Sequence, residues 1–204
     1  MQEYLTIMGE AEGEITVERS RFIAAAIHID GEQDALDFIA RKRAEYHDAK
    51  HNCFAYSLYS GLSRSSDDGE PHGTAGKPML DIIGGSEIKD VCVVVTRYFG
   101  GVLLGTGGLV RAYSAATREA LENAVKVKMQ PCTEYRLTCA YSDYDYLNKI
   151  ISRFGIVEES NFTESVTLSV AIRAAEEDEF KNTVEKTFLS GVKIEKICDK
   201  VIPL

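Results

Sequence analysis

The stretch Val91-Cys-Val-Val-Val-Thr-Arg-Tyr-Phe-Gly-Gly-Val-Leu-Leu-Gly-Thr-Gly-Gly-Leu-Val-Arg111 carries the strongest fold signal in the chain. Its first part, Val91–Tyr98, crowds β-branched residues into a short apolar run, which predicts a strand. Because the run is apolar at consecutive positions, it indicates a central strand covered on both faces. The glycine-rich segment after it predicts a turn, and the helical spacing of apolar residues beyond that turn predicts a long helix over 107–125.

Upstream of this stretch, the pattern predicts two strands around a turn over 13–29, an amphipathic helix over 33–46 and a strand over Cys53–Tyr59. Glycine is unevenly spread, since eleven of the 16 glycines fall between Gly61 and Gly108. Glycine permits positive φ and close backbone approach. We therefore expect a loop system whose backbone shape matters, and such loops often carry function.

The last third of the chain follows a β-α-β-β-α-β order. The expected strands cover 132–141, 156–159, 165–173 and 192–201, and the expected helices cover 142–154 and 176–188. This order predicts a ferredoxin-like unit whose sheet has one helix-covered face and one open face. Pro131 follows the end of the preceding helical pattern, so we place a boundary near 126–131. The expected fold class is α+β, with domains 1–128 and 129–204.

Composition limits the classes of function. The 204 residues are 45% apolar, with 23 basic and 32 acidic residues and a net charge of −9, which fits an ordinary folded protein. This charge disfavours bulk phosphate binding, so RNA contact would need a local basic patch. No apolar run reaches the ~20 residues of a membrane span, and no signal pattern opens the chain, so we expect a cytoplasmic protein. Five cysteines without a C-x-x-C pair predict neither a zinc ribbon nor a disulfide framework, and we expect no metal and no cofactor.

The first candidate site is an acidic loop. Asp67, Asp68 and Glu70 stand within four residues, with Arg64 before them and His72 after them. Carboxylates this close can hold a hard cation or raise one another's pKa for acid–base work. His72 is the residue of the loop that can exchange a proton near neutral pH. The same composition is typical of a polar turn, and that alternative stays open.

The second candidate site is the glycine-rich start of the predicted helix. Free N–H groups and the helix dipole make such a terminus attractive to anions. The residues assigned to it are Gly105, Thr106, Gly107 and Gly108, together with the cations Lys77, Arg97 and Arg111. The Thr106 hydroxyl is the expected N-cap. Tight strand-to-helix packing would also explain the glycines, because the segment has neither Walker nor G-x-G-x-x-G spacing.

We expect the 64–78 and 97–111 segments to meet, because polar glycine-rich loops gather where the strands of one sheet end. Arginine and lysine side chains would then offset the carboxylates. A salt-bridge network that only pins the loop is the alternative. Tyr98 and Phe99 would stack bases if they were exposed, and would belong to the core if they were buried.

Several motifs resemble the IMPACT/YigZ family, in its bacterial form with a C-terminal ferredoxin-like domain. They are Ser20-Arg-Phe-Ile-Ala24, Ala49-Lys-His-Asn-Cys-Phe-Ala-Tyr56, Asp67-Asp-Gly-Glu-Pro-His-Gly-Thr-Ala-Gly-Lys-Pro78 and Val95-Thr-Arg-Tyr-Phe-Gly-Gly-Val-Leu-Leu-Gly-Thr-Gly-Gly-Leu-Val-Arg-Ala-Tyr113. The resemblance covers 15–125 strongly. One departure is His72, where serine is more usual in the family.

The resemblance implies a first domain like domain 2 of ribosomal protein S5 and a second like domain V of elongation factor G. It also implies a role in translation, because eukaryotic family members regulate translation by competing for a kinase activator. We therefore expect a non-catalytic regulator or binding protein whose partner is RNA, the ribosome or a translation-associated protein. No membrane partner and no DNA sequence specificity are expected. The alternative is an enzyme that acts on a phosphorylated or anionic small molecule, using the 67–78 acidic loop and the 105–108 glycine loop. No Ser-His-Asp or Cys-His signature accompanies it.

Overall fold

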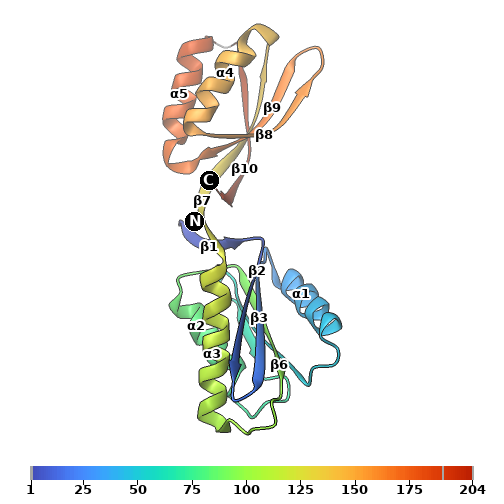
Figure 1. Ribbon diagram of the computed structural model, residues 1–204. Coiled ribbons are helices and arrows are strands. Elements are labelled where there is room, and N and C mark those ends of the chain that lie inside the picture. The colour runs from blue at the N-terminus through green and yellow to red at the C-terminus, as the bar shows by residue number, and fades with distance from the viewer. Residues whose placement is uncertain (1, 190, 204) are drawn as a thin grey trace. The chain divides into compact units, whose positions relative to one another are not determined.

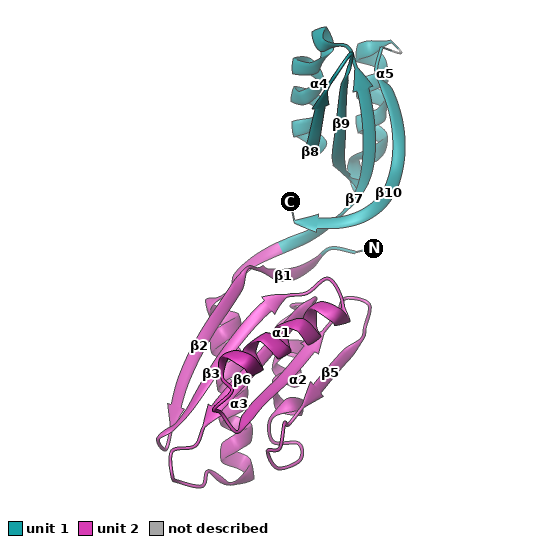
Figure 2. Ribbon diagram, turned by 90° about the vertical axis from the view of Figure 1, so that its right-hand side faces the viewer, with its two compact units in different colours: residues 1–3, 128–204 teal, residues 4–127 magenta. Residues whose placement is uncertain are grey.

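The computed structural model describes residues 2–189 and 191–203. The chain divides into two compact units, one of residues 4–127 and one of residues 1–3 and 128–204, which Figure 2 colours separately. Each unit has its own hydrophobic core. Within the described residues, no helix is both long enough and apolar enough to cross a membrane.

The unit of residues 4–127 is built on an antiparallel sheet with strand order β2-β3-β6-β4-β5. The strands are β2 (Glu10–Val17), β3 (Ser20–His28), β4 (His51–Ser57), β5 (Ser63–Ser66) and β6 (Val91–Tyr98). β6 lies in the centre, between β3 and β4, and its residues 91–97 are all buried. The prediction of a central strand over Val91–Tyr98 is confirmed.

Helices cover both faces of this sheet (Figure 1). The helices are α1 (Glu32–Glu45), α2 (Gly76–Gly85) and α3 (Gly105–Asn123). Val93 and Val95 of β6 belong to the core formed with α2 and α3, whereas Cys92 and Val94 belong to the core formed with α1. Because successive strand residues point to opposite faces, a strand buried on both faces is apolar at every position.

The unit of residues 128–204 has the β-α-β-β-α-β order expected of a ferredoxin-like unit. Its elements are β7 (Val125–Cys139), α4 (Tyr141–Phe154), β8 (Gly155–Phe162), β9 (Val166–Arg173), a 3₁₀ turn (Ala174–Glu176), α5 (Glu177–Phe188) and β10 (Lys193–Pro203). The sheet order is β10-β7-β9-β8, and both helices pack on one face around Leu147 and Phe180. No helix among the described residues covers the other face of this sheet.

The structure differs from the sequence pattern at several element boundaries. α3 runs over Gly105–Asn123 rather than 107–125, and β1 (Tyr4–Met8), β5 and α2 had no counterpart in the prediction. β7 begins at Val125, so a continuous strand runs through Pro131. Pro131 lies opposite Val201 of β10, whereas pairing with β9 starts only at the next residue, Cys132. A proline, which has no N–H to donate, is tolerated at such a position.

Candidate functional site

Asp67 organises the acidic loop by accepting three backbone hydrogen bonds. Its Oδ1 accepts the N–H groups of Ala75 (2.9 Å) and Gly76 (2.8 Å), and its Oδ2 accepts that of Gly73 (2.7 Å). Burial by itself would raise the pKa of Asp67, but the hydrogen bonds from Gly73, Gly76 and Ala75 outweigh it and leave the pKa below its usual value. Ala75 is the N-cap of α2, so this carboxylate caps the helix from eight residues upstream.

Asp68 ties the same loop to β4 and α1. Its Oδ2 accepts the backbone N–H of Asn52 (2.7 Å), and its Oδ1 accepts a hydrogen bond from Arg43 (2.6 Å). The His51 Nδ1 donates to the Asp68 carbonyl oxygen at 2.8 Å. With a φ of 43°, Asp68 is in the left-handed region that aspartate tolerates in turns. The carboxylate is therefore committed to holding the loop against the sheet.

Glu70 forms a buried ion pair that joins the acidic loop to the glycine-rich segment. The Glu70 Oε1 accepts hydrogen bonds from Arg97 Nη1 (2.6 Å) and from the Tyr113 hydroxyl (2.9 Å). The two paired side chains are only 3% and 8% exposed. The Arg97 guanidinium also lies 5.5 Å from the Phe22 ring centroid and 5.6 Å from that of Phe99. The 64–78 and 97–111 segments thus meet as expected, through a pair that is closed to solvent.

Arg97 consequently differs from the surface cation that the sequence suggested. Its guanidinium is engaged by Glu70, lies near two aromatic rings and is only 8% exposed, so a large ligand has no access to it. The Arg97 Nε is buried and has no hydrogen-bond partner among the described residues. Arginine side chains usually reach solvent, but Arg97 lies on the central strand, between β3 and β4, and is buried there.

The remaining charged residues of the two segments lie apart from this pair. Arg64 Nε, on β5, is 3.1 Å from Glu32 Oε1, and Lys77, on α2, pairs with Asp81 one turn later. His72 is fully exposed, with its Nδ1 3.8 Å from an Asp67 oxygen. Across residues 2–189 and 191–203, no cluster of three or more His, Cys, Asp or Glu side chains is suited to a metal ion. The three carboxylates of the loop thus serve three different structural contacts.

The N-terminus of α3 is open. The helix begins at Gly105, with Leu104 as N-cap and no side-chain hydrogen bond to cap it. Thr106 therefore lies inside the first turn, and the expectation that its hydroxyl caps the helix is wrong. The Arg111 guanidinium folds back toward this turn, because its Nη1 lies 3.7 Å from the point that a Cβ on Gly107 would occupy. Free N–H groups and an exposed guanidinium together favour a negative charge.

The loop between β6 and α3 carries exposed apolar side chains that sequence reasoning missed. Phe99 is 54% exposed, Val102 41% and Leu103 88%. The Val102-Leu-Leu104 run inside a glycine-rich loop was the available signal, because loop tips are ordinarily polar. Tyr98 is half-buried and donates to Asp48 at 2.6 Å, so Phe99 is the more exposed of the two aromatic residues.

This loop rests on the turn between β2 and β3. The Gly100 N–H donates to the Ser20 Oγ at 3.1 Å, and a Cβ at Gly100 would lie 2.0 Å from the backbone of Arg19. Arg19 and Arg111 are exposed and have no ion-pair partner among the described residues. We name the resulting patch the glycine-loop surface; it comprises Arg19, Phe99, Val102, Leu103, Gly105–Gly107 and Arg111.

The open sheet face of the other unit has a different character. Lys200 lies between two carboxylates, 3.0 Å from Glu134 and also paired with Glu158. A shallow cavity of about 260 Å³ beside them is lined by Glu134, Arg136, Glu159, Asn161, Thr167, Ser169 and Ile197. Two glutamates and one arginine are the charged residues of this lining, and no aromatic side chain belongs to it, so the cavity offers a base no ring to stack on.

Comparison with known proteins gives matches in both units. A family model described as the Impact N-terminal domain matches residues 18–121, and a domain of unknown function (DUF1949) matches residues 137–187. IMPACT family member YvyE of Bacillus subtilis (strain 168) is 38% identical over 188 residues, covering 91% of this chain and 82% of the relative. IMPACT family member YigZ of Escherichia coli (strain K12) is 41% identical over 172 residues, covering 80% of this chain and 83% of the relative. A crystal structure described as that of a hypothetical protein has 35% identity and a TM-score of 0.67, and the match covers 97% of this chain and 98% of the other.

Proposed function

The chain belongs to the IMPACT family, and from that premise we propose that it is a non-catalytic binding protein linked to translation. Its partner is a translation-associated protein, met in the cytoplasm and bound at the glycine-loop surface. The link to translation is what the family resemblance implies. The choice of surface rests on the contacts of this chain.

The observation that carries the proposal is the exposure of the loop before α3. Leu103 is 88% exposed, with Phe99 and Val102 beside it in the chain. Exposed apolar side chains that gather in one place and are rimmed by polar groups are typical of interaction sites. Burying Leu103 and Val102 against a partner would remove apolar surface from water and supply the favourable free energy of binding.

The charges of this surface favour a partner with a negatively charged group. The unpaired Arg19 and Arg111 and the free N–H groups of Gly105–Gly107 all favour negative charge. An acidic group beside an apolar side chain on the partner would satisfy both parts of the surface. The aliphatic side chains of Val102 and Leu103 at the tip favour a protein segment over an RNA backbone, because they can be buried against apolar side chains and gain nothing from phosphates.

The enzyme alternative has no comparable support. Asp67 caps α2, Asp68 ties the loop to Asn52 and Arg43, and Glu70 is buried against Arg97. Acid–base chemistry requires a group that can reach the substrate. Asp67 and Asp68 are 20% and 27% exposed but hold structural hydrogen bonds, and Glu70 is only 3% exposed.

The test is site-specific photo-crosslinking in cells, with a crosslinking amino acid in place of Leu103 and, in a control variant, in place of Leu189. Leu189 is 83% exposed in the other unit, so it matches Leu103 in chemistry and exposure. We expect position 103, and not position 189, to crosslink a component of the translation apparatus. Crosslinks to RNA instead of protein would show that the partner at this surface is RNA. Equal yields at both positions, or none at either, would contradict the proposal.

A further inference from the structure

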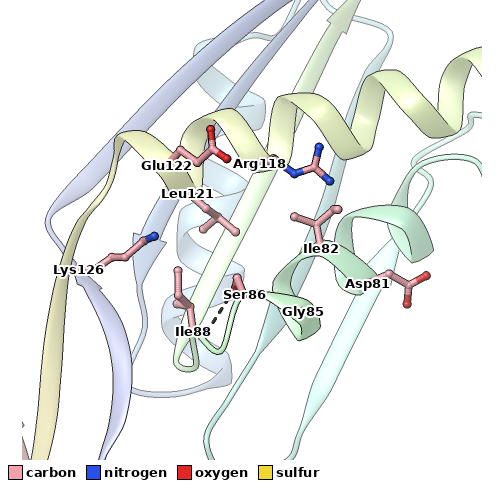
Figure 3. Close-up of a pocket in the computed structure, with 9 residues that line it drawn as sticks. All are labelled: Asp81, Ile82, Gly85, Ser86, Ile88, Arg118, Leu121, Glu122 and Lys126. Atoms are coloured by element: carbon pink, nitrogen blue, oxygen red, sulfur yellow. Dashed lines mark hydrogen bonds between the residues drawn. The ribbon is translucent and has the colours of Figure 1, made fainter.

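A pocket lies at the end of α3 away from the glycine-loop surface (Figure 3). Its volume is about 340 Å³, and its lining comes from α2, α3, the segment before β6 and the start of β7. Arg118 is 13 residues beyond Gly105, which is about 20 Å along the helix. The pocket is therefore separate from the surface assigned to the protein partner, and we name it the Arg118 pocket.

The inner wall of the Arg118 pocket is apolar. Ile88 is fully buried and Leu121 is 3% exposed, while Ile82 is half-buried. Figure 3 shows these three side chains pointing toward one another, each from a different element. The Ser86 hydroxyl donates to the Ile83 carbonyl oxygen at 2.7 Å, so it is already engaged by the backbone. An occupant would meet hydrocarbon along this wall.

The rim of the pocket is charged, and its charges are free. Arg118, Glu122 and Lys126 are exposed, and none has an ion-pair or hydrogen-bond partner among the described residues. Asp81 is neutralised by Lys77. Two free cations against one free carboxylate leave the rim with a single positive charge, which suits a monoanion better than a phosphate dianion.

We propose that the Arg118 pocket binds a small carboxylate with an apolar body. Arg118 binds the carboxylate, and the apolar body packs on Ile82, Ile88 and Leu121. Lys126, at the other end of the pocket in Figure 3, adds to the positive charge of the rim. A volume of this size is typical of small-ligand pockets with an apolar wall and a few polar groups. Two sources share this chemistry, a free aliphatic acid and the C-terminal residue of a peptide.

The experiment is a titration of the ¹⁵N-labelled full chain, followed by amide chemical shifts. The probes are hexanoate, hexan-1-ol, and a short peptide ending in leucine with either a free or an amidated C-terminus. We expect saturable shifts confined to 81–88 and 118–126 with the free carboxylates. Binding of hexanoate alone would identify a free acid as the source, and binding of the free-carboxyl peptide alone would identify a chain terminus.

Variants test the two cations. Arg118→Gln with Lys126→Gln should weaken binding at least ~10-fold, because charge-assisted contacts to a carboxylate are lost. Neither residue has a partner to lose, so the variant should keep its fold.

Arg111→Gln is the control, since it removes the same charge from the same helix at the other end and should leave hexanoate binding unchanged. Hexanol binding as tightly as hexanoate, shifts elsewhere in the chain, or no binding by either carboxylate would overturn the proposal. The absence of crosslinks from position 103 would contradict the protein-binding role of the glycine-loop surface and would leave the proposal for the Arg118 pocket unaffected.

Discussion

At the scale of single residues, the acidic loop shows that the role of a carboxylate depends on the groups that surround it in the fold. Asp67, Asp68 and Glu70 are neighbours in sequence, yet one caps a helix, one ties down a strand and one is buried with an arginine. Each role depends on a partner brought in from elsewhere. The loop therefore holds a helix, a strand and a buried arginine in place. We expect changes to its charged groups to alter the free energy of unfolding.

Glu70→Ala should lower the free energy of unfolding by about 3–5 kcal/mol, because it leaves the Arg97 guanidinium buried without its anion. Urea unfolding followed by circular dichroism measures the change. Glu14→Ala is the matched control: it breaks the exposed pair with Arg21 and should have little effect. Equal losses for the two variants would show that the burial of the Glu70–Arg97 pair has no energetic consequence.

Asp67 makes a pH-dependent contribution to stability. Its pKa in the folded chain lies below that in the unfolded chain, because backbone N–H groups stabilise its charged form. The contribution is complete above the unfolded-state pKa of about 3.9 and is lost as the pH falls through the lower folded-state value. The stability difference between wild type and Asp67→Asn should therefore be largest at neutral pH and shrink in acid.

Urea unfolding across this pH range measures the Asp67 difference. Asp145→Asn, at an exposed carboxylate with no partner among the described residues, is the control. A difference for Asp67→Asn that stays constant down to pH values below the unfolded-state pKa would show that the charge of Asp67 is not what caps α2.

At the scale of elements, the loop from β6 into α3 is shaped by close backbone contact. The Gly100 N–H binds Ser20, and the absence of a Cβ lets the two backbones touch. This packing holds one end of the loop, while Val102 and Leu103 extend into solvent and the first turn of α3 stays uncapped. The exposed tip is thus presented from a fixed base.

Gly100→Ala should destabilise the first unit by about 1–3 kcal/mol, because the new methyl group would lie 2.0 Å from a backbone atom of Arg19. Thermal unfolding measures the loss. Gly84→Ala, within α2, is the matched control: no atom lies within 4 Å of its added Cβ, and it should stabilise by about 0.4–1 kcal/mol. Similar effects of the two alanines would mean that the contact at Gly100 relaxes without strain.

At the scale of the whole molecule, two units with separate cores share one chain. The first unit packs helices on both faces of its sheet, and the second packs α4 and α5 on a single face. Their surfaces differ accordingly. The glycine-loop surface carries exposed apolar side chains and free cations, whereas the cavity on the open sheet face of the second unit is lined mainly by polar and charged side chains of both signs.

We propose that residues 1–128 and 129–204 fold independently, because each core is complete within its own unit. Each fragment expressed alone should give dispersed amide signals and a cooperative unfolding transition. The spectrum of each should overlay on that of the full chain away from β7, which the cut interrupts. Fragments that stay unfolded alone and fold only when mixed would show that the two units form one cooperative structure.

The sequence by itself determined most of the regular elements, though not β1, β5 or α2. β6 and the β-α-β-β-α-β order were predictable because apolar periodicity is a local property of a strand or helix. The glycine-rich turn before α3 was predictable because the backbone freedom of glycine is also a local property. Elements with little apolar periodicity, such as β5 with the sequence Ser63-Arg-Ser-Ser66, escaped prediction because contacts with other elements decide them.

Only the tertiary structure decided what the charged and loop residues do. Arg97 was expected to be a surface cation, but it is buried in an ion pair with Glu70, which lies 27 residues away in sequence and also accepts a hydrogen bond from Tyr113. Leu103 drew no prediction from the sequence, yet it is 88% exposed. Arg118 and Lys126 become the rim of one pocket because α3 and the start of β7 bring them together. The burial of a charged side chain and the identity of its partner depend on groups distant in sequence. A local sequence pattern therefore cannot predict them.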